Sequence, residues 1–186
     1  MTGLPALWMP ILLSAIAVFF LSSIIHMLSP WHKGDYPGVP REDEVMAALR
    51  PFAIPPGDYM VPRPATAQAM RSPAFVEKMQ QGPVMVLTVW PNGIASMARY
   101  LGMWFVYLVA VGTLAAFVAG RALPLGAPSD RVRQLTGMTA FAGYALALWQ
   151  MAIWYRRSMS TTVKATVDGA LYAVVTAFIF AWCWPH

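Results

Sequence analysis

Four long stretches without a charged side chain constrain the fold of this chain more than any other feature. Asp, Glu, Lys and Arg are absent from residues 1–30, 100–120, 134–155 and 169–186. An α-helix rises 1.5 Å per residue, so each stretch is long enough to cross the roughly 30 Å hydrocarbon core of a bilayer. The sequence therefore predicts an all-α integral membrane protein that forms a single membrane domain, residues 1–186. Its four transmembrane helices are expected at residues 7–28, 100–120, 135–155 and 167–184.

Composition agrees with this class and excludes others. Charged residues make up 11% of the chain and hydrophobic residues 58%, against about 25% charged residues in soluble domains. The net charge of +5 does not indicate nucleic-acid binding, because the Lys and Arg residues are dispersed and flank the apolar stretches. The lone cysteine, Cys183, excludes an intrachain disulfide and a CxxC redox site. The N-terminus lacks the basic region of a signal peptide, so we expect the first apolar segment to remain as a helix.

Small residues recur at every fourth position in three of the predicted helices. Such stripes allow close approach of helix backbones, which lipid tails do not otherwise promote. We expect them to pack the bundle of this chain, and the stripe in the last helix has a second interpretation as a contact with another subunit. The predicted packing residues are Gly112, Ala116, Gly120, Gly143, Ala147, Gly169, Ala173, Ala177 and Ala181.

The loop between the first two spans, residues 31–98, is the longest segment outside the membrane. Acidic residues at 42–44 begin one predicted short helix, which ends at Arg50-Pro51. Ser72 as N-cap, Pro73 and Gly82 delimit a second. Residues 84–90 are apolar, β-branched and too short to span, which favours a strand or an interfacial segment. We expect a cap on the membrane surface, with a docking surface for a partner protein as the alternative.

The distribution of positive charge predicts the orientation. Four spans place the long loop and the loop at 156–164 on one side, and both termini and the loop at 121–133 on the other. The first side carries Lys33, Arg41, Arg99, Arg156, Arg157 and Lys164; the second carries Arg121, Arg131 and Arg133. The positive-inside rule therefore places the long loop in the cytoplasm and both termini outside a bacterial inner membrane.

Three histidines were considered as ligands for a metal or haem. His26 lies inside the first predicted span, and His32 and His186 lie outside spans. A bis-His haem needs opposed imidazoles on facing helices, and the thirteen methionines lack a repeated copper-binding pattern. We therefore expect His26 to be an interfacial residue with a local hydrogen bond, and we predict no metal and no cofactor.

One polar layer is predicted at a membrane boundary. Alternating helix direction brings the end of the first span, the start of the second, the end of the third and the start of the fourth to similar depth. Polar groups at such a depth are costly and mark structural or functional sites. The structural interpretation is a set of interhelical hydrogen bonds and a pair between Asp168 and an Arg or Lys. The functional interpretation is a pocket for a lipid headgroup, quinone or small polar ligand, with candidate ligand-binding residues His26, Tyr100, Gln150, Asp168 and Arg156.

Several stretches resemble a family of small bacterial inner-membrane proteins with no assigned activity. They include residues 8–14, His26-Met27, Pro30-Trp31-His32, Asp35-Tyr36, Leu148-Trp149-Gln150, Ile153-Trp154-Tyr155, Thr161-Thr162, Lys164 and Asp168-Gly169. The resemblance covers most of the chain and implies a four-helix membrane protein, but no mechanism. The Ser/His and Glu/His pairs of membrane proteases, and the embedded Glu of small multidrug transporters, are missing from the sequence.

Two functions remain open, and a membrane-bound enzyme ranks below both because no catalytic spacing is present. The first is a non-catalytic accessory or scaffolding subunit of a larger inner-membrane assembly, with the bilayer and other membrane subunits as partners. The second is a protein that binds a small molecule or lipid, or a transporter, through the polar layer. The absence of an inverted repeat argues against a transporter.

Overall fold

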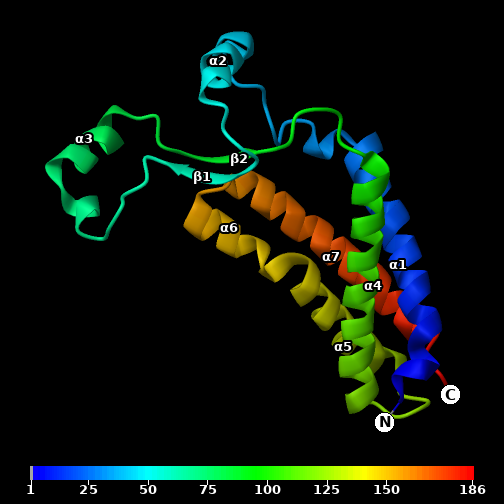
Figure 1. Ribbon diagram of the computed structural model, residues 1–186. Helices are drawn as coiled ribbons and strands as arrows, with labels where there is room; N and C mark the ends of the chain where they lie inside the picture. Colours follow the sequence, from blue (N-terminus) through cyan, green and yellow to red (C-terminus); the bar gives the residue numbers. More distant parts are fainter. Residues whose placement is uncertain (1) are drawn as a thin grey trace. The chain divides into compact units, whose positions relative to one another are not determined.

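The computed structural model describes residues 2–186, which form two compact units (Figure 1). The helical unit consists of the chain up to Tyr36 together with Ser96–His186, and the loop unit is Pro37–Ala95. The sequence predicted one membrane domain with a surface loop at 31–98. Residues 31–36 and 96–98 of that predicted loop belong to the helical unit, and the remainder forms a compact unit with its own strand pairing.

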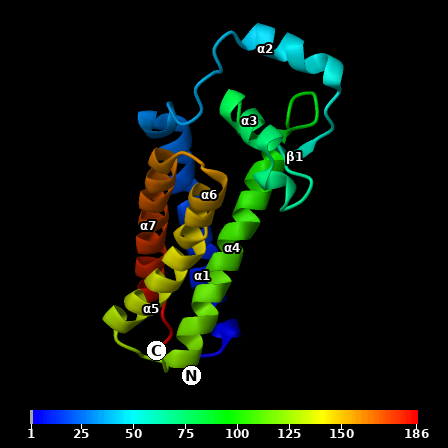
Figure 2. The ribbon, with the colours of Figure 1, turned by 90° about the vertical axis from the view of Figure 1, so that its left-hand side faces the viewer.

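The helical unit is a bundle of four helical segments, each of which we call a leg (Figures 1 and 2). The first leg runs through a 3₁₀ turn η1 (Leu4–Leu7), α1 (Trp8–Ser23) and a π-helical turn η2 (Ile24–Leu28), and a 3₁₀ turn η3 (Pro30–His32) follows it. The second leg is α4 (Met97–Ala122). The third consists of α5 (Ser129–Phe141), a π-helical segment η6 (Ala142–Leu146) and α6 (Leu148–Tyr155), and the fourth is α7 (Met159–Trp182).

Three helices of the described chain are long and apolar enough to cross a membrane: Leu4–Leu28, Met97–Ala122 and Met159–Trp182. The third predicted span, 135–155, is not one continuous α-helix. It is divided between α5 and α6, of 13 and 8 residues, and each is too short to span alone. The first of these two helices, α5, begins earlier than predicted, at Ser129. Its first residues are polar, and they lower the mean hydropathy of the segment.

The structure corrects the predicted position of Asp168 in the fourth leg. We expected this helix to begin near residue 167 with Asp168 in its first turn. Instead α7 begins at Met159, where the Ser158 side chain accepts a hydrogen bond from the Thr161 amide. Asp168 therefore lies well inside the helix, and exposed N-terminal amides do not stabilise its carboxylate.

Most of the predicted packing residues lie against neighbouring legs of the same chain. A Cβ built on Gly169 would lie 3.0 Å from the Ala145 Cβ, and one on Gly143 would lie 3.1 Å from Val111. Gly112 lies against Ile11 of α1, and Gly120 lies against the backbone of Thr2. Ala116, Ala173 and Ala177 are buried and Ala181 is half-buried. These small residues bring the legs close together.

Ala147 is the exception among them, because it is exposed. It was predicted to share a face with Gly143, as it would in a regular α-helix. The π-helical segment η6 ends immediately before Ala147. A π-helix bonds i to i+5 and rotates the following residues away from the regular register, so Ala147 does not follow Gly143 onto the packed face.

Both ends of the described chain meet the α4–α5 connection (Figure 1). The Thr2 amide donates to the Gly120 carbonyl at 2.8 Å, and the Gly126 amide donates to the Pro185 carbonyl at 2.8 Å. The Trp184 indole N–H donates to the Pro124 carbonyl at 3.0 Å. These contacts hold the chain ends at the end of the bundle opposite the turn that follows α1.

The loop unit contains the two predicted short helices, and the apolar run at 84–90, expected as a strand or an interfacial segment, forms a strand. Its elements are α2 (Glu42–Leu49), η4 (Arg50–Phe52), β1 (Gly57–Val61), η5 (Ala69–Arg71), α3 (Pro73–Gln81) and β2 (Met85–Val89). Ser72 caps α3 as expected and accepts from the Phe75 amide at 3.3 Å. The strands pair antiparallel, with Gly57 opposite Val89 and Val61 opposite Met85. Residues 37–95, all of which the structure describes, include no buried residue.

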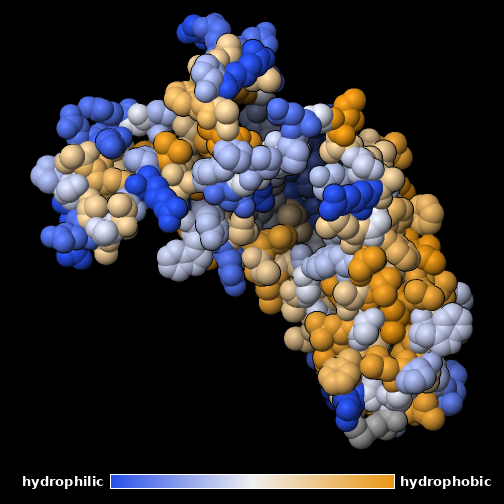
Figure 3. Space-filling model, in the orientation of Figure 1, coloured by the Kyte–Doolittle hydropathy of each residue, from blue (hydrophilic) through white to orange (hydrophobic). Residues whose placement is uncertain are grey.

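Surface hydropathy differs between the units (Figure 3). Hydrophobic residues cover the α1 and α4 side of the helical unit, and hydrophilic residues gather on α2 and α3. The apolar exterior of the helical unit fits contact with lipid. The exposed side chains of α1 include Ile16 and Phe20.

Candidate functional site

The first component of the candidate site is the π-helical turn η2, which carries His26. The His26 Nδ1 lies 3.0 Å from the Ser22 carbonyl oxygen, one turn earlier. This contact confirms the local hydrogen bond that the sequence analysis expected. A neutral ring that donates from Nδ1 leaves the lone pair on its Nε2 free. Single π-turns within helices are frequent at functional sites.

The second component is the turn that follows, which brings His32 back over His26. Ser29 caps this turn by accepting from the Trp31 amide at 3.0 Å, and Pro30 occupies its first position. The His26 and His32 rings then stack, with centroids 4.3 Å apart and planes inclined by 9°. The two histidines, six residues apart in sequence, therefore lie face to face.

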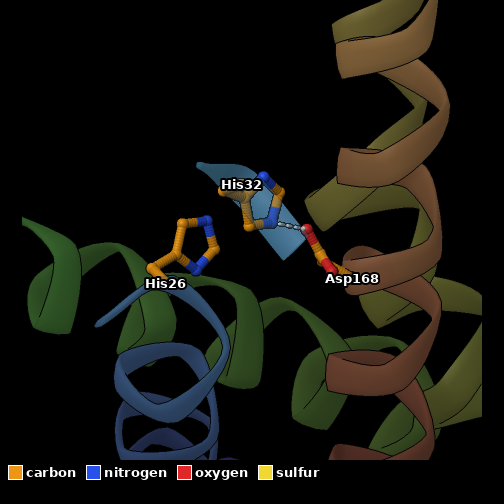
Figure 4. Close-up of side chains that lie close together, drawn as sticks. All are labelled: His26, His32 and Asp168. Carbon is orange, nitrogen blue, oxygen red and sulfur yellow. Dashed lines mark hydrogen bonds and ion pairs between the residues drawn. The ribbon is translucent and has the colours of Figure 1, made fainter. Parts of the chain in front are cut away.

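His32 lies between two carboxylates, Asp35 of the same turn and Asp168 of α7, and Figure 4 shows the contact with Asp168. Its Nδ1 is 2.6 Å from Asp35 Oδ2, and its Nε2 is 2.9 Å from Asp168 Oδ2. The His32 side chain is 15% exposed, and the two carboxylates are 6% and 5% exposed. His32 therefore connects Asp35 of its own turn to Asp168 of α7.

Lys164 joins α7 to the same turn from one helical turn before Asp168. Its Nζ donates to Asp35 Oδ1 at 2.6 Å and to the Trp31 carbonyl at 2.8 Å. It also lies 5.6 Å from the centroid of the Trp31 ring. The hydrogen bond from Lys164, followed by that from His32, lowers the pKa of Asp35 below its ordinary value of 3.8. Asp35 is therefore an ionised bridge between the turn and α7.

These contacts correct the predicted pairing of Asp168. The sequence analysis expected an Arg or Lys as its partner. In the structure Asp168 contacts His32, and the nearby ammonium of Lys164 contacts Asp35 instead. The physical reason is the early start of α7, which places Lys164 and Asp168 on the same face of one helix, where each contacts a different residue of the turn.

A cavity of about 720 Å³ opens beside this cluster, within the helical unit. We call it the bundle cavity. Its walls are mainly apolar and aromatic, with polar atoms at a few positions. Its lining residues are Ser22, Ser23, His26, Met27, Met97, Leu101, Trp104, Tyr107, Tyr144, Leu148, Ala165, Asp168, Gly169 and Tyr172. Its size and lining are typical of a pocket for a small molecule.

Four aromatic side chains line the cavity: Trp104, Tyr107, Tyr144 and Tyr172. Trp104 packs edge-on against Tyr172, and Tyr172 against Tyr144, with ring centroids 6.2 and 5.7 Å apart. The Trp104 indole N–H donates to the Ser22 hydroxyl at 2.9 Å. The Tyr172 hydroxyl is buried and has no hydrogen-bond partner among residues 2–186. An unsatisfied buried hydroxyl costs about 1–3 kcal/mol, so it is a position where a ligand atom would be stabilised.

The five predicted ligand-binding residues divide into two groups. His26 and Asp168 line the bundle cavity, as the polar layer predicted. Tyr100, Gln150 and Arg156 do not line it, and all three are exposed. Arg156 ends α6 with a φ of 52°, and the break at η6 changes the face on which Gln150 lies. The sequence analysis assigned no role in this site to His32, Asp35, Trp104 or Tyr172.

The observations define a class of protein but not a family. The chain is mostly helical, and its three long apolar helices fit a membrane-embedded protein with a cavity in its helical unit. Comparison with protein-family models, curated proteins and solved structures finds no match. The function proposed below is therefore argued from the site alone.

Proposed function

We propose that this chain is a four-pass membrane protein that binds a small lipophilic molecule with a hydrogen-bonding end in the bundle cavity. The observation that carries the proposal is the buried hydroxyl of Tyr172, which has no hydrogen-bond partner among residues 2–186 and belongs to a residue that lines this mainly apolar and aromatic cavity. A hydroxyl donor among aromatic side chains suits a quinone, whose carbonyl accepts a hydrogen bond and whose ring stacks.

The proposal includes a membrane crossing by the third leg. Residues 134–155 carry no charged side chain, and α5, η6 and α6 follow one another through them. Irregular backbone is tolerated at membrane depth where protein groups satisfy it. The Tyr107 hydroxyl of α4 donates to the Gly143 carbonyl within η6, so a neighbouring helix satisfies one backbone group at the break.

We further propose a bacterial inner-membrane location with a cytoplasmic loop unit and both termini outside. The excess of Lys and Arg beside the loop unit supports this orientation. A cysteine introduced at Ala65 in a Cys183→Ser background should react with an impermeant maleimide only after the inner membrane is permeabilised. Leu125→Cys, in the exposed α4–α5 connection, should react without permeabilisation. The reverse pattern would contradict this orientation.

Ligand binding is tested by thermal unfolding of the purified protein in detergent. A ligand that binds only the folded state stabilises it by about 2.7 kcal/mol at a concentration of one hundred times its Kd. A short-chain ubiquinone analogue should raise the Tm of the wild type. It should not raise that of Ala165→Phe, in which a bulky side chain occupies the cavity. The matched control is Val174→Phe, an exposed position on the same helix that does not line the cavity. Equal shifts in all three proteins would contradict the proposal.

A second function, as an accessory subunit of a membrane assembly, is favoured by the loop unit. None of its residues is buried, yet it exposes large apolar side chains such as Phe52, at 72%, and Trp90, at 73%. A partner subunit would cover these side chains. A photo-crosslinking residue in place of Trp90 should capture a defined membrane protein in native membranes, whereas one in place of Gln80 of α3 should not. Equal capture at both positions would contradict this function.

A further inference from the structure

We propose that His26, His32 and Asp168 form a binding site for a divalent first-row transition-metal ion. Each residue offers one ligand atom, and these atoms all lie within 4.8 Å of one another. Figure 4 shows the three side chains converging from η2, from the turn η3 that follows it, and from α7. Segments 136 residues apart in the sequence thus contribute to one cluster.

The ligand set selects the class of metal. Two imidazoles and one carboxylate are the protein ligands of many zinc sites and of non-haem iron(II) sites, whereas Mg²⁺ and Ca²⁺ prefer oxygen ligands alone. Ligand atoms bound to one tetrahedral ion at 2.0–2.2 Å lie about 3.3 Å from each other. His32 Nε2 and Asp168 Oδ2 are already 2.9 Å apart. The exposed ring of His26 has room to rotate and close the remaining distance.

The hydrogen-bond partners of the two histidines are of the kind that orient the ligands in metal sites. A metal-binding histidine usually directs its second ring nitrogen to a carbonyl or carboxylate. His26 directs Nδ1 to the Ser22 carbonyl, and His32 directs Nδ1 to Asp35. Lys164 in turn fixes Asp35. The His26 Nε2 is therefore available to the ion, and the His32 Nε2 would exchange its contact with Asp168 for the ion that both residues would bind.

The charge of the cluster also favours a cation. Asp35 and Asp168 contribute two carboxylates, and the Lys164 side chain contacts Asp35. Partly buried carboxylates are stable when paired with positive charge. A divalent ion beside Asp168 would supply that charge while Lys164 remains with Asp35.

Three protein ligands leave a coordination position open. Zinc sites with three protein ligands keep the fourth position for water or substrate. His26 and Asp168 line the bundle cavity, so the open position would face that cavity and be accessible to a ligand atom. The metal site stands on its own ligands and is independent of quinone binding.

The test is calorimetric titration of the full-length, metal-stripped protein with Zn²⁺ alone, using a purification tag without histidine. The wild type should bind one ion per chain. His26→Gln and His32→Gln should each weaken that binding by at least about tenfold. His186→Ala, which removes the histidine outside the cluster, should leave it unchanged. His26→Gln is expected to fold normally because its side chain is exposed, and circular dichroism checks this.

Cobalt(II) supplies a second measurement that reports ligand type directly. The wild type and His186→Ala should develop the visible d–d absorption of a low-symmetry site with nitrogen and oxygen ligands, and the two cluster variants should lose it. Absence of saturable Zn²⁺ binding in the wild type would overturn the proposal. Equal binding in wild type and His26→Gln would overturn it too. Failure of quinone to bind would leave these results unaffected, so the two proposals are separable.

Discussion

At the residue scale, Asp35 connects the turn after α1 to α7. Its two carboxylate oxygens contact different partners, Lys164 and His32, each at 2.6 Å. His32 in turn contacts Asp168. Because one side chain links both partners, the position of the His32 ring depends on Asp35 as well as on its own turn.

Asp35→Asn should lower the thermal stability of the protein and reduce its sensitivity to acid. The pKa of Asp35 is lowered in the folded state, by Lys164 first and then by His32. The carboxylate therefore stabilises the fold above pH 3.8, and this contribution is lost as pH falls through the lower folded-state pKa. Thermal unfolding in detergent between pH 7 and pH 3 measures both effects. An unchanged Tm at pH 7 would contradict the structural role of Asp35.

Tyr172→Phe should separate stability from ligand binding. The variant removes a buried hydroxyl that has no partner in the described chain, so the ligand-free protein should be as stable as the wild type or more stable by up to about 1 kcal/mol. The stabilisation by added quinone should decrease, because the ligand loses its donor. A clear loss of stability without ligand would show that the hydroxyl is already satisfied.

Little of the residue-scale site could be predicted from the sequence. His26 and Asp168 were predicted to lie at one depth, because alternating helix direction follows from the apolar stretches. The contact of His32 with Asp168 depends on how the turn after α1 folds back, and no local pattern encodes that turn. Tyr172 and Trp104 lie within apolar stretches, where an aromatic residue facing a cavity looks the same as one facing lipid.

At the element scale, the two π-helical segments distinguish this bundle from four regular helices. Both η2 and η6 border the bundle cavity, through His26 and Tyr144. Each changes the helical register and re-aims the side chains that follow. The long stretches without charged residues predicted where the apolar helices lie. The same signal could not predict the break in the third leg. A π-helical turn adds one residue to the helix, and the segment remains free of charged residues whether or not that turn is present.

Close packing of α7 against η6 is tested by Gly169→Val. A Cβ at this position would lie 3.0 Å from Ala145 and 3.3 Å from Tyr144. Because these neighbours are packed, the larger side chain should destabilise the protein by about 1–3 kcal/mol. Chemical unfolding in mixed micelles measures the change.

The matched control for Gly169→Val is Gly102→Ala in α4. A Cβ there would meet no atom within 4 Å, so this substitution should leave stability unchanged or raise it by about 0.5–1 kcal/mol. Similar losses in both variants would contradict the packing that the structure assigns to Gly169.

At the scale of the whole molecule, the chain combines an apolar helical unit with a loop unit that has no buried residue among positions 37–95. The helical unit contains the bundle cavity and the His26, His32 and Asp168 cluster, so the proposed ligand and metal both depend on it. The loop unit exposes large apolar side chains, which the proposed partner subunit would cover. This division favours binding in the helical unit and association through the loop unit.

The central claim, that the bundle cavity holds a lipophilic molecule, is tested most directly by native mass spectrometry after mild extraction from the membrane. The wild type and Val174→Phe should each retain one small molecule of the same defined mass, and Ala165→Phe should not. If all three proteins carry the same adducts, or if the wild type carries only bulk lipid, the bundle cavity is not a binding site and the proposed function is wrong.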